Sequence, residues 1–152
     1  MIETQVQWLT DAEQTAWRAY LRGSRRLEVA LGEDLEAVGL SLAEYELISM
    51  LSEAPGQAMR MSALADLIVQ SRSRVTHTAA RLERRGLVQR TTCESDGRGV
   101  LLVLTDEGRT AVSRAAQVHV ESVRRHLVSP LTPQQFQALG EAMQIVRDGL
   151  QD

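Results

Sequence analysis

Apolar residues recur at every third or fourth position in several long segments of the chain, and this spacing predicts amphipathic helices. The first segment covers residues 11–38 and ends at Gly39. The second begins after Ser41, whose hydroxyl is expected to form a capping box with Glu44, and it stops before Pro55. The first third of the chain is therefore predicted to be helical.

Two shorter helices are predicted next. Ser62 is the expected N-cap of the first, and a break at residues 70–71 separates it from the second. The second helix runs to Arg85 and is closed by Gly86, because glycine is common just after the end of a helix. Two helices joined by a few residues are typical of a helix-turn-helix.

The pattern then changes to two apolar runs typical of strands, residues 87–92 and residues 100–104. The segment between them, residues 93–99, contains two glycines and is typical of a turn. The two runs therefore predict a β-hairpin. A hairpin that directly follows a helix-turn-helix makes it a winged one.

Two more helices are predicted in the last third of the chain. Thr105 caps the first, which breaks at residues 129–130. Thr132 caps the second, with Pro133 at the first helical position, where a missing N–H leaves no bond unmade. The last helix carries a stripe of apolar residues, Phe136, Leu139, Met143, Val146 and Leu150.

These elements predict a single domain over residues 1–152, of a mainly α fold class with a small β-hairpin wing. The winged helix-turn-helix covers residues 41–104, and long helices over residues 11–38 and 106–150 flank it. No apolar run approaches the roughly 18 residues of a membrane span, and the N-terminus lacks the pattern of a secretory signal. A single cysteine also fits a reducing compartment, so the expected location is cytoplasmic.

The formal net charge of −3 argues at first against a nucleic-acid partner, but the charge is segregated along the chain. Residues 1–59 carry a net charge of −6, residues 60–98 a net charge of +4, and residues 99–152 a net charge of −1. All 17 basic residues are arginine. A basic centre between acidic ends indicates an anionic partner for one face of the molecule.

The second helix of the predicted helix-turn-helix has two distinct faces. At about 100° per residue, Val75, Ala79 and Leu82 share one face and are expected to be buried. The opposite face holds small and basic residues and no acid, as expected for a helix that enters the major groove of DNA. Together with the preceding helix and the hairpin, it supplies the candidate DNA-binding residues Ser62, Ser71, Arg72, Ser73, Arg74, Thr76, His77, Arg81, Arg84 and Arg98.

The hairpin tip supplies a second candidate contact. Arg98 stands where an arginine on a wing can enter the minor groove, whose negative potential attracts it. Asp96 and Gly97 are interpreted as wing support, with Asp96 pairing with Arg98 or with a neighbouring arginine. Asp-Gly is also a common turn signal, and both roles can hold at once.

With these features the sequence resembles the MarR family of bacterial transcriptional regulators. The resemblance covers nearly the whole chain, and one departure is Gly97, where a basic residue often stands. The stretches that carry it are Leu64-Ala65 with Leu67, Val75-Thr76, residues 81–88 (RLERRGLV), residues 96–101 (DGRGVL) and residues 104–108 (LTDEG).

The resemblance implies a homodimer in which the helices over residues 11–38 and 106–150 of two subunits interlock. The apolar stripe from Phe136 to Leu150 supports this, because it exceeds what one small module can cover. Two-fold symmetry then predicts a pseudo-palindromic operator in double-stranded DNA, with half-sites about 10 bp apart. The expected function is a repressor released by a small-molecule effector, for which the family suggests an aromatic acid. Its candidate site residues are Trp17, Tyr20, Tyr45 and His119.

The sequence also offers alternatives to this function. A redox-responsive regulator would use Cys93, but Glu94 beside it is expected to raise the pKa of the thiol, which favours an unreactive cysteine. His119 and His126 lack a third ligand at suitable spacing, so no metal or other cofactor is predicted. No motif of an enzyme is present. A winged-helix module that binds protein and not DNA is the remaining alternative.

Overall fold

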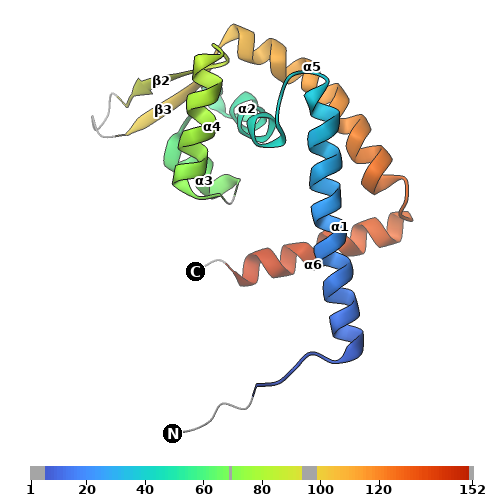
Figure 1. Cartoon of the computed structure of the whole chain (residues 1–152). Coiled ribbons are helices and arrows are strands. Elements are labelled where there is room, and N and C mark those ends of the chain that lie inside the picture. The colour runs from blue at the N-terminus through green and yellow to red at the C-terminus, as the bar shows by residue number, and fades with distance from the viewer. Residues whose placement is uncertain (1–5, 69, 94–98, 151–152) are drawn as a thin grey trace, which may run out of the picture.

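The computed structural model describes residues 6–68, 70–93 and 99–150. Figure 1 shows a group of short helices and strands on one side and the longer helices α1, α5 and α6 on the other, with α6 passing across α1 in this view. In chain order the elements are α1 (Asp11–Glu36), α2 (Leu42–Glu53), η1 (Pro55–Gln57), β1 (Ala58–Arg60), α3 (Met61–Leu67), α4 (Arg72–Arg84), β2 (Val88–Thr92), β3 (Val100–Leu104), α5 (Asp106–Val123), the π-helical segment η2 (Arg124–Val128) and α6 (Pro133–Gly149).

Most of the predicted helix starts are confirmed. The backbone N–H of Ser41 donates to a carboxylate oxygen of Glu44 at 3.0 Å, and the N–H of Glu44 donates to the Ser41 hydroxyl at 3.2 Å. The hydroxyls of Thr105 and Thr132 accept the corresponding bonds at the starts of α5 and α6. Local sequence signals therefore set the starts of α2, α5 and α6.

The expected cap at Ser62 is wrong. Helix α3 begins at Met61 with Arg60 as its N-cap residue, and no side chain caps this end. The cause is the strand β1, which ends at Arg60 and pairs with β3. The chain passes from this strand directly into the helix, so Ser62 already lies inside the first turn.

The strand β1 enlarges the predicted hairpin to a three-stranded antiparallel sheet of order β1-β3-β2. Both hairpin strands are present, with Val88 opposite Leu104 and Thr92 opposite Val100. Strand β1 has only 3 residues, which is too short for an alternating pattern to be visible in the sequence. The sheet therefore ties the segment before α3 to the wing.

The core lies where α2, α4, β3 and the end of α1 meet. The predicted buried face of α4 is confirmed, because Val75, Ala79 and Leu82 are all buried. Leu35 of α1 and Ala115 of α5 belong to the same hydrophobic cluster. Each fully buried leucine contributes about 1.5–3 kcal/mol to the stability of the fold. The long helices are therefore anchored firmly at this point to the winged module, by which we mean α2 to β3.

Gly108 lies in the first turn of α5, pressed against the backbone of the wing. A β-carbon at this position would overlap the carbonyl oxygen of Leu87 and a methyl group of Leu104. The hydroxyl of Thr105 also donates to the carbonyl of Gly86 at 2.6 Å. These contacts give a physical reason for the Leu-Thr-x-x-Gly stretch: only a glycine lets α5 start so close to the residue that precedes β2.

The helices α1 and α6 leave large apolar side chains uncovered. Trp17 is 48% exposed, Ile145 is 73% exposed and Leu150 is 78% exposed. Within its own chain, the most extensive backbone contact of α6 is with η2. Over the described ranges, no helix combines the length and the apolar character needed to cross a lipid bilayer.

Candidate nucleic-acid interface

The exposed face of α4 is small and basic along its whole length. Ser71 caps the helix, its hydroxyl accepting a 3.3 Å bond from the N–H of Arg74. Thr78 is also buried, which the sequence pattern did not indicate, and it lies with Val75 on the inner side. The exposed residues of the cap and helix are Ser71, Arg72, Ser73, Arg74, Thr76, His77 and Arg84.

A groove of about 470 Å³ lies between α3, α4 and the sheet. It brings together three of the predicted residues, Ser62, Arg72 and Thr76. It is also lined by Arg60 and Arg90, two arginines that are not among the DNA-binding residues predicted from the sequence. Arg60 ends a strand too short to detect, whereas the position of Arg90 within a predicted strand could have marked it as a surface residue. Three guanidinium groups around one groove favour an anion such as a phosphate.

Arg90, which lines this groove, forms an ion pair with an acid of α4. The Nε of Arg90 donates to a carboxylate oxygen of Glu83 at 2.6 Å, which joins α4 to β2. This hydrogen bond holds the pKa of Glu83 below its ordinary value. The one acid in α4 is thereby paired and adds little net negative charge to the exposed face.

A second hollow, of about 360 Å³, lies between the start of α2 and α4. It is lined by Ala43 together with Ser73, Arg74, His77, Thr78 and Arg81. Arg81 differs from the other arginines of this group, because its Nε lies 3.7 Å from a carboxylate oxygen of Glu44. Arg81 is thus held by Glu44 of the same chain, while Arg74 and His77 face outward.

The tip of the wing lies outside the described residues. The expected minor-groove contact Arg98 and its supports Asp96 and Gly97 fall in this segment, so their roles stay predictions. On its edge, the N–H of Cys93 donates to the carbonyl of Gly99 at 2.8 Å. Cys93 is only 5% exposed, which favours the unreactive thiol over the redox alternative.

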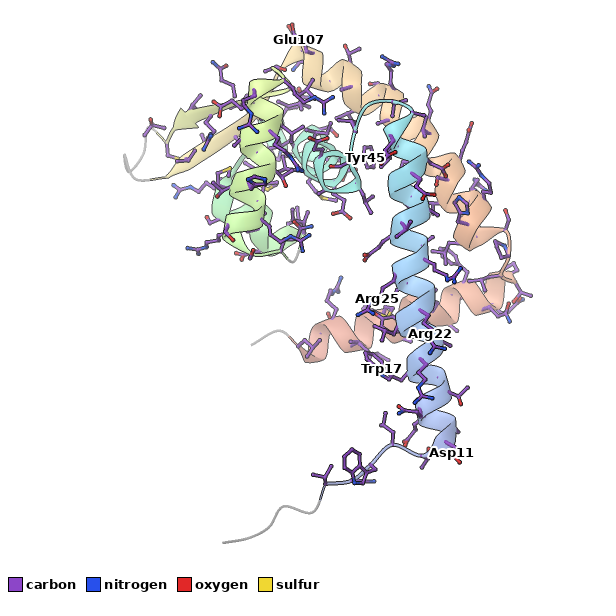
Figure 2. All side chains as sticks on the ribbon, in the orientation of Figure 1. Asp11, Trp17, Arg22, Arg25, Tyr45 and Glu107 are labelled. Atoms are coloured by element: carbon purple, nitrogen blue, oxygen red, sulfur yellow. The ribbon has the colours of Figure 1, made fainter. Side chains whose placement is uncertain are left out.

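The four aromatic and histidine candidates for an effector site form two separate pairs. The rings of Trp17 and Tyr20 stack with centroids 6.0 Å apart, and those of Tyr45 and His119 lie 4.5 Å apart. Figure 2 shows Trp17 near the crossing of α1 and α6. Tyr45, on α2, lies on the side of that helix that faces α1 and α5. The four residues therefore do not line one common site within a single chain.

The Tyr45–His119 pair adjoins an apolar hollow. Burial lowers the pKa of His119, and its Nδ1 is buried without a hydrogen-bond partner among the described residues. His119 also lines a hollow of about 460 Å³ whose other lining residues are Val120, Val123, Arg124, Val128 and Phe136. An apolar space with one guanidinium and one imidazole at its wall suits a small organic anion.

A helix-turn-helix with a basic outer face, followed by a wing, defines the class of winged helix-turn-helix proteins. Comparison with known proteins narrows this class. Residues 38–99 match the MarR family. The chain is 30% identical over 116 residues to the HTH-type transcriptional regulator PecS of Dickeya dadantii, an alignment that covers 75% of this chain and 69% of PecS.

Two solved structures from Streptomyces coelicolor are similar over almost their whole length. AbsC, a MarR family transcriptional regulator, superposes with a TM-score of 0.90 at 43% identity, covering 95% of this chain and 98% of AbsC. Sco3205, a MarR family regulator crystallised in complex with DNA, superposes with a TM-score of 0.94 at 41% identity, covering 99% of this chain and 94% of Sco3205. The chain belongs to the MarR family and is a DNA-binding transcriptional regulator, not an enzyme.

Proposed function

We propose that the protein is a homodimeric repressor that binds a pseudo-palindromic operator and is released from it by a small organic anion. The observation that carries this proposal is the outer face of α4, where Arg72, Arg74, Arg84 and the hydroxyls between them are exposed. Sco3205, which is 41% identical, was crystallised with DNA. In the proposal, α4 enters the major groove of one half-site.

The candidate residues take different roles in this proposal. Arg74 and His77, near the start of α4, face the base edges, where arginine can bind guanine through two hydrogen bonds. Ser62, Arg72 and Thr76, in the groove beside the sheet, bind the phosphate backbone together with Arg60, whereas Arg90 stays paired with Glu83. Ser71 and Ser73 contact the DNA with their hydroxyls at the N-terminus of α4, and Arg84 contacts a phosphate further along the helix. Arg98, with Asp96 and Gly97, is assigned to the minor groove on its sequence position alone.

The homodimer is supported by the apolar surface of α1 and α6. Trp17 is nearly half exposed in the single chain, and Ile145 and Leu150 are more than two thirds exposed. Contiguous apolar surface of this kind is unfavourable in water and marks an interaction site. A second copy buries these faces and places two α4 helices on one side of the DNA.

The effector is proposed to be an aromatic acid. The hollow beside His119 supports this class, because apolar side chains surround it and the guanidinium of Arg124 can pair with a carboxylate. Tyr45, which contacts His119, connects the hollow to α2 and so to the DNA-binding module. Trp17 and Tyr20 come into the site only through a partner subunit.

Binding to the upstream region of the protein's own gene tests the proposal. Fluorescence anisotropy with this DNA should give an affinity that falls steeply as salt increases, and Arg74→Ala should weaken it and alter the base preference. Arg114→Ala, which removes the same charge from the exposed side of α5, is the matched control. A reporter gene behind this region should be derepressed when the regulator is deleted. Binding that is absent or insensitive to salt would contradict the operator, and reporter activity that falls on deletion would contradict repression.

A thermal-shift screen of aromatic acids tests the effector. A ligand that binds the folded dimer should raise its melting temperature and lower its affinity for the operator at the same concentration. His119→Ala and Arg124→Ala should reduce both effects. If no aromatic acid shifts the melting temperature, the effector belongs to another chemical class.

A further inference from the structure

Glu44 is the only charged residue in the buried class within the part of the chain that the structure describes. Its carboxylate does more than cap α2. One oxygen accepts hydrogen bonds from the N–H of Ser41 at 3.0 Å and from Nη1 of Arg85 at 3.1 Å. The other oxygen lies 3.7 Å from Nε of Arg81. One buried carboxylate therefore joins the start of α2 to the last turn of α4.

Arg85 extends this connection to the end of α1. Its second terminal nitrogen, Nη2, donates to the carbonyl of Gly39 at 2.7 Å. Gly39, with φ of +77°, closes the turn between α1 and α2. A planar guanidinium can hold a carboxylate and a carbonyl at once, which an ammonium group cannot do with the same geometry. Glu44 and Arg85 thus connect the end of α1, the start of α2 and the end of α4.

The surroundings of Arg81 differ from those of the outward-facing arginines. Its Nε is buried and has no hydrogen-bond partner among the described residues, so the charge of Glu44 is what balances it. A buried carboxylate that loses its cationic partners is strongly unfavourable. Glu44, Arg81 and Arg85 therefore form one unit, which we call the Glu44 cluster, and its geometry depends on the position of α4.

We propose that the Glu44 cluster is a positioning device for DNA recognition: Glu44 and Arg85 fix the direction of α4 relative to α1, and Arg81 belongs to this cluster and not to the DNA contacts. Helix α1 is part of the proposed dimer interface. The direction of α4 relative to α1 therefore sets the separation of the two α4 helices in the dimer. The spacing part of the proposal rests on the dimer proposed above. The affinity part rests only on DNA binding, which the family membership establishes.

Glu44→Gln and Arg85→Gln test the positioning role, with Glu53→Gln as the matched control for the first and Arg114→Gln for the second. Glu53 is an exposed acid at the end of the same helix, so its substitution changes the net charge equally without touching the Glu44 cluster. Ser41→Ala is a second control, because it removes the hydroxyl cap of α2 and leaves the carboxylate and both arginines. Anisotropy is measured with specific and with random-sequence DNA of equal length, and with operators whose half-sites are moved by one base pair.

Glu44→Gln should lower the affinity for specific DNA by roughly tenfold. Its affinity for random DNA should equal that of Glu53→Gln, because non-specific binding depends on charge and not on the direction of α4. The double variant should lose little more than either single variant, and the preference for one half-site spacing should weaken. Arg81→Ala should match Arg114→Ala on random DNA, because both remove one positive charge. On specific DNA it should show the additional loss expected for Glu44→Gln, without the altered base preference expected for Arg74→Ala.

Equal losses on specific and random DNA, or a Glu44→Gln protein identical to Glu53→Gln, would overturn the proposal. If Glu44→Gln does not fold, Arg85→Lys keeps the charge while losing the bridge to Gly39, and the same selective loss is then expected from it. If the wild-type protein does not bind the DNA upstream of its own gene, the proposed operator is refuted but this test remains valid. The affinity measurements can then use a site selected from random sequences.

Discussion

The hydroxyl of Ser122 donates a 2.5 Å hydrogen bond to a carboxylate oxygen of Asp34, joining the end of α5 to the last turns of α1. The same oxygen lies 3.1 Å from Nε2 of His126 and 3.6 Å from Nη2 of Arg125. Ser122 is completely buried, so water cannot replace Asp34 as its partner. This carboxylate therefore holds the two long helices together beside the winged module.

The stability contributed by Asp34 should depend on pH. The hydrogen bond from Ser122, together with His126 and Arg125, keeps the pKa of Asp34 below its ordinary value of 3.8. Because the folded-state pKa is the lower one, this contribution is complete above the unfolded-state pKa and disappears as the pH falls through the folded-state pKa. Asp34→Asn should lower the melting temperature at neutral pH and flatten the decline of stability below about pH 4. Thermal melting of both proteins from pH 2 to pH 7 checks this, and parallel curves would contradict it.

Arg72 is predicted to bind a phosphate. It lines the groove with Arg60 and Arg90 and is exposed. Arg72→Ala should weaken binding to all DNA sequences alike and reduce the slope of log K against log salt by about 1. Titrations at four salt concentrations measure the slope. Arg114→Ala should leave it unchanged, and a change in base preference for Arg72→Ala would instead assign Arg72 to a base.

Glu83 is predicted to restrain Arg90. The 2.6 Å pair keeps the guanidinium directed at α4. Glu83→Gln removes one negative charge and leaves Arg90 able to reach a phosphate. Its affinity for random DNA should increase, and the salt dependence should become steeper by about 0.9. A weaker affinity for random DNA would show that the pair supports the wing more than it restrains the arginine.

The apolar face of α6 is predicted to hold the dimer together. Ile145→Arg places a charge at a side chain that is 73% exposed in the single chain, so the monomer should fold normally. In the dimer the charge would lie in an apolar interface, and the dimer affinity should fall by about 100-fold or more. Sedimentation velocity at micromolar concentration measures this. Leu67→Arg, an equally apolar exposed site on α3, should remain dimeric.

Gly108 is predicted to be intolerant of any side chain. Gly108→Ala should destabilise the fold by about 1–3 kcal/mol, because the methyl group would overlap the Leu87 carbonyl. Gly32→Ala in α1 is the matched control, since a β-carbon there meets no atom within 4 Å. This control should stabilise the helix by up to about 1 kcal/mol. Chemical denaturation measures both, and equal stabilities would contradict the packing argument.

Features set by neighbouring residues were predictable from the sequence. The Ser41–Glu44 capping box, the buried face of α4 and the two hairpin strands all follow from spacings within a few residues. The start of α3 at Met61 was not predictable, because strand β1, which leads into it, pairs with β3, more than forty residues away in the chain. Long-range pairing of this kind leaves no periodic signal in so short a segment.

The candidate site was predicted in its composition but not in its internal contacts. Ser62, Arg72 and Thr76 share one groove, as their common assignment implied. Arg81 has the same residue type and nearly the same helix face as the outward arginines, yet it lies against Glu44, 37 positions earlier in the chain. Only the packing of α2 against α4 decides which arginines stay available to a ligand.

The close approach of Gly108 to Leu87 makes the first turn of α5 and the wing a single rigid piece. An 18-residue helix such as α5 is about 27 Å long, and its other end carries Ser122 and meets η2. Because the helix is rigid, a tilt of about 5° about that end moves the end next to the wing by roughly 2 Å over this length. Such a displacement is enough to break a hydrogen bond to DNA. A small change at the far end of α5 can thus displace the wing.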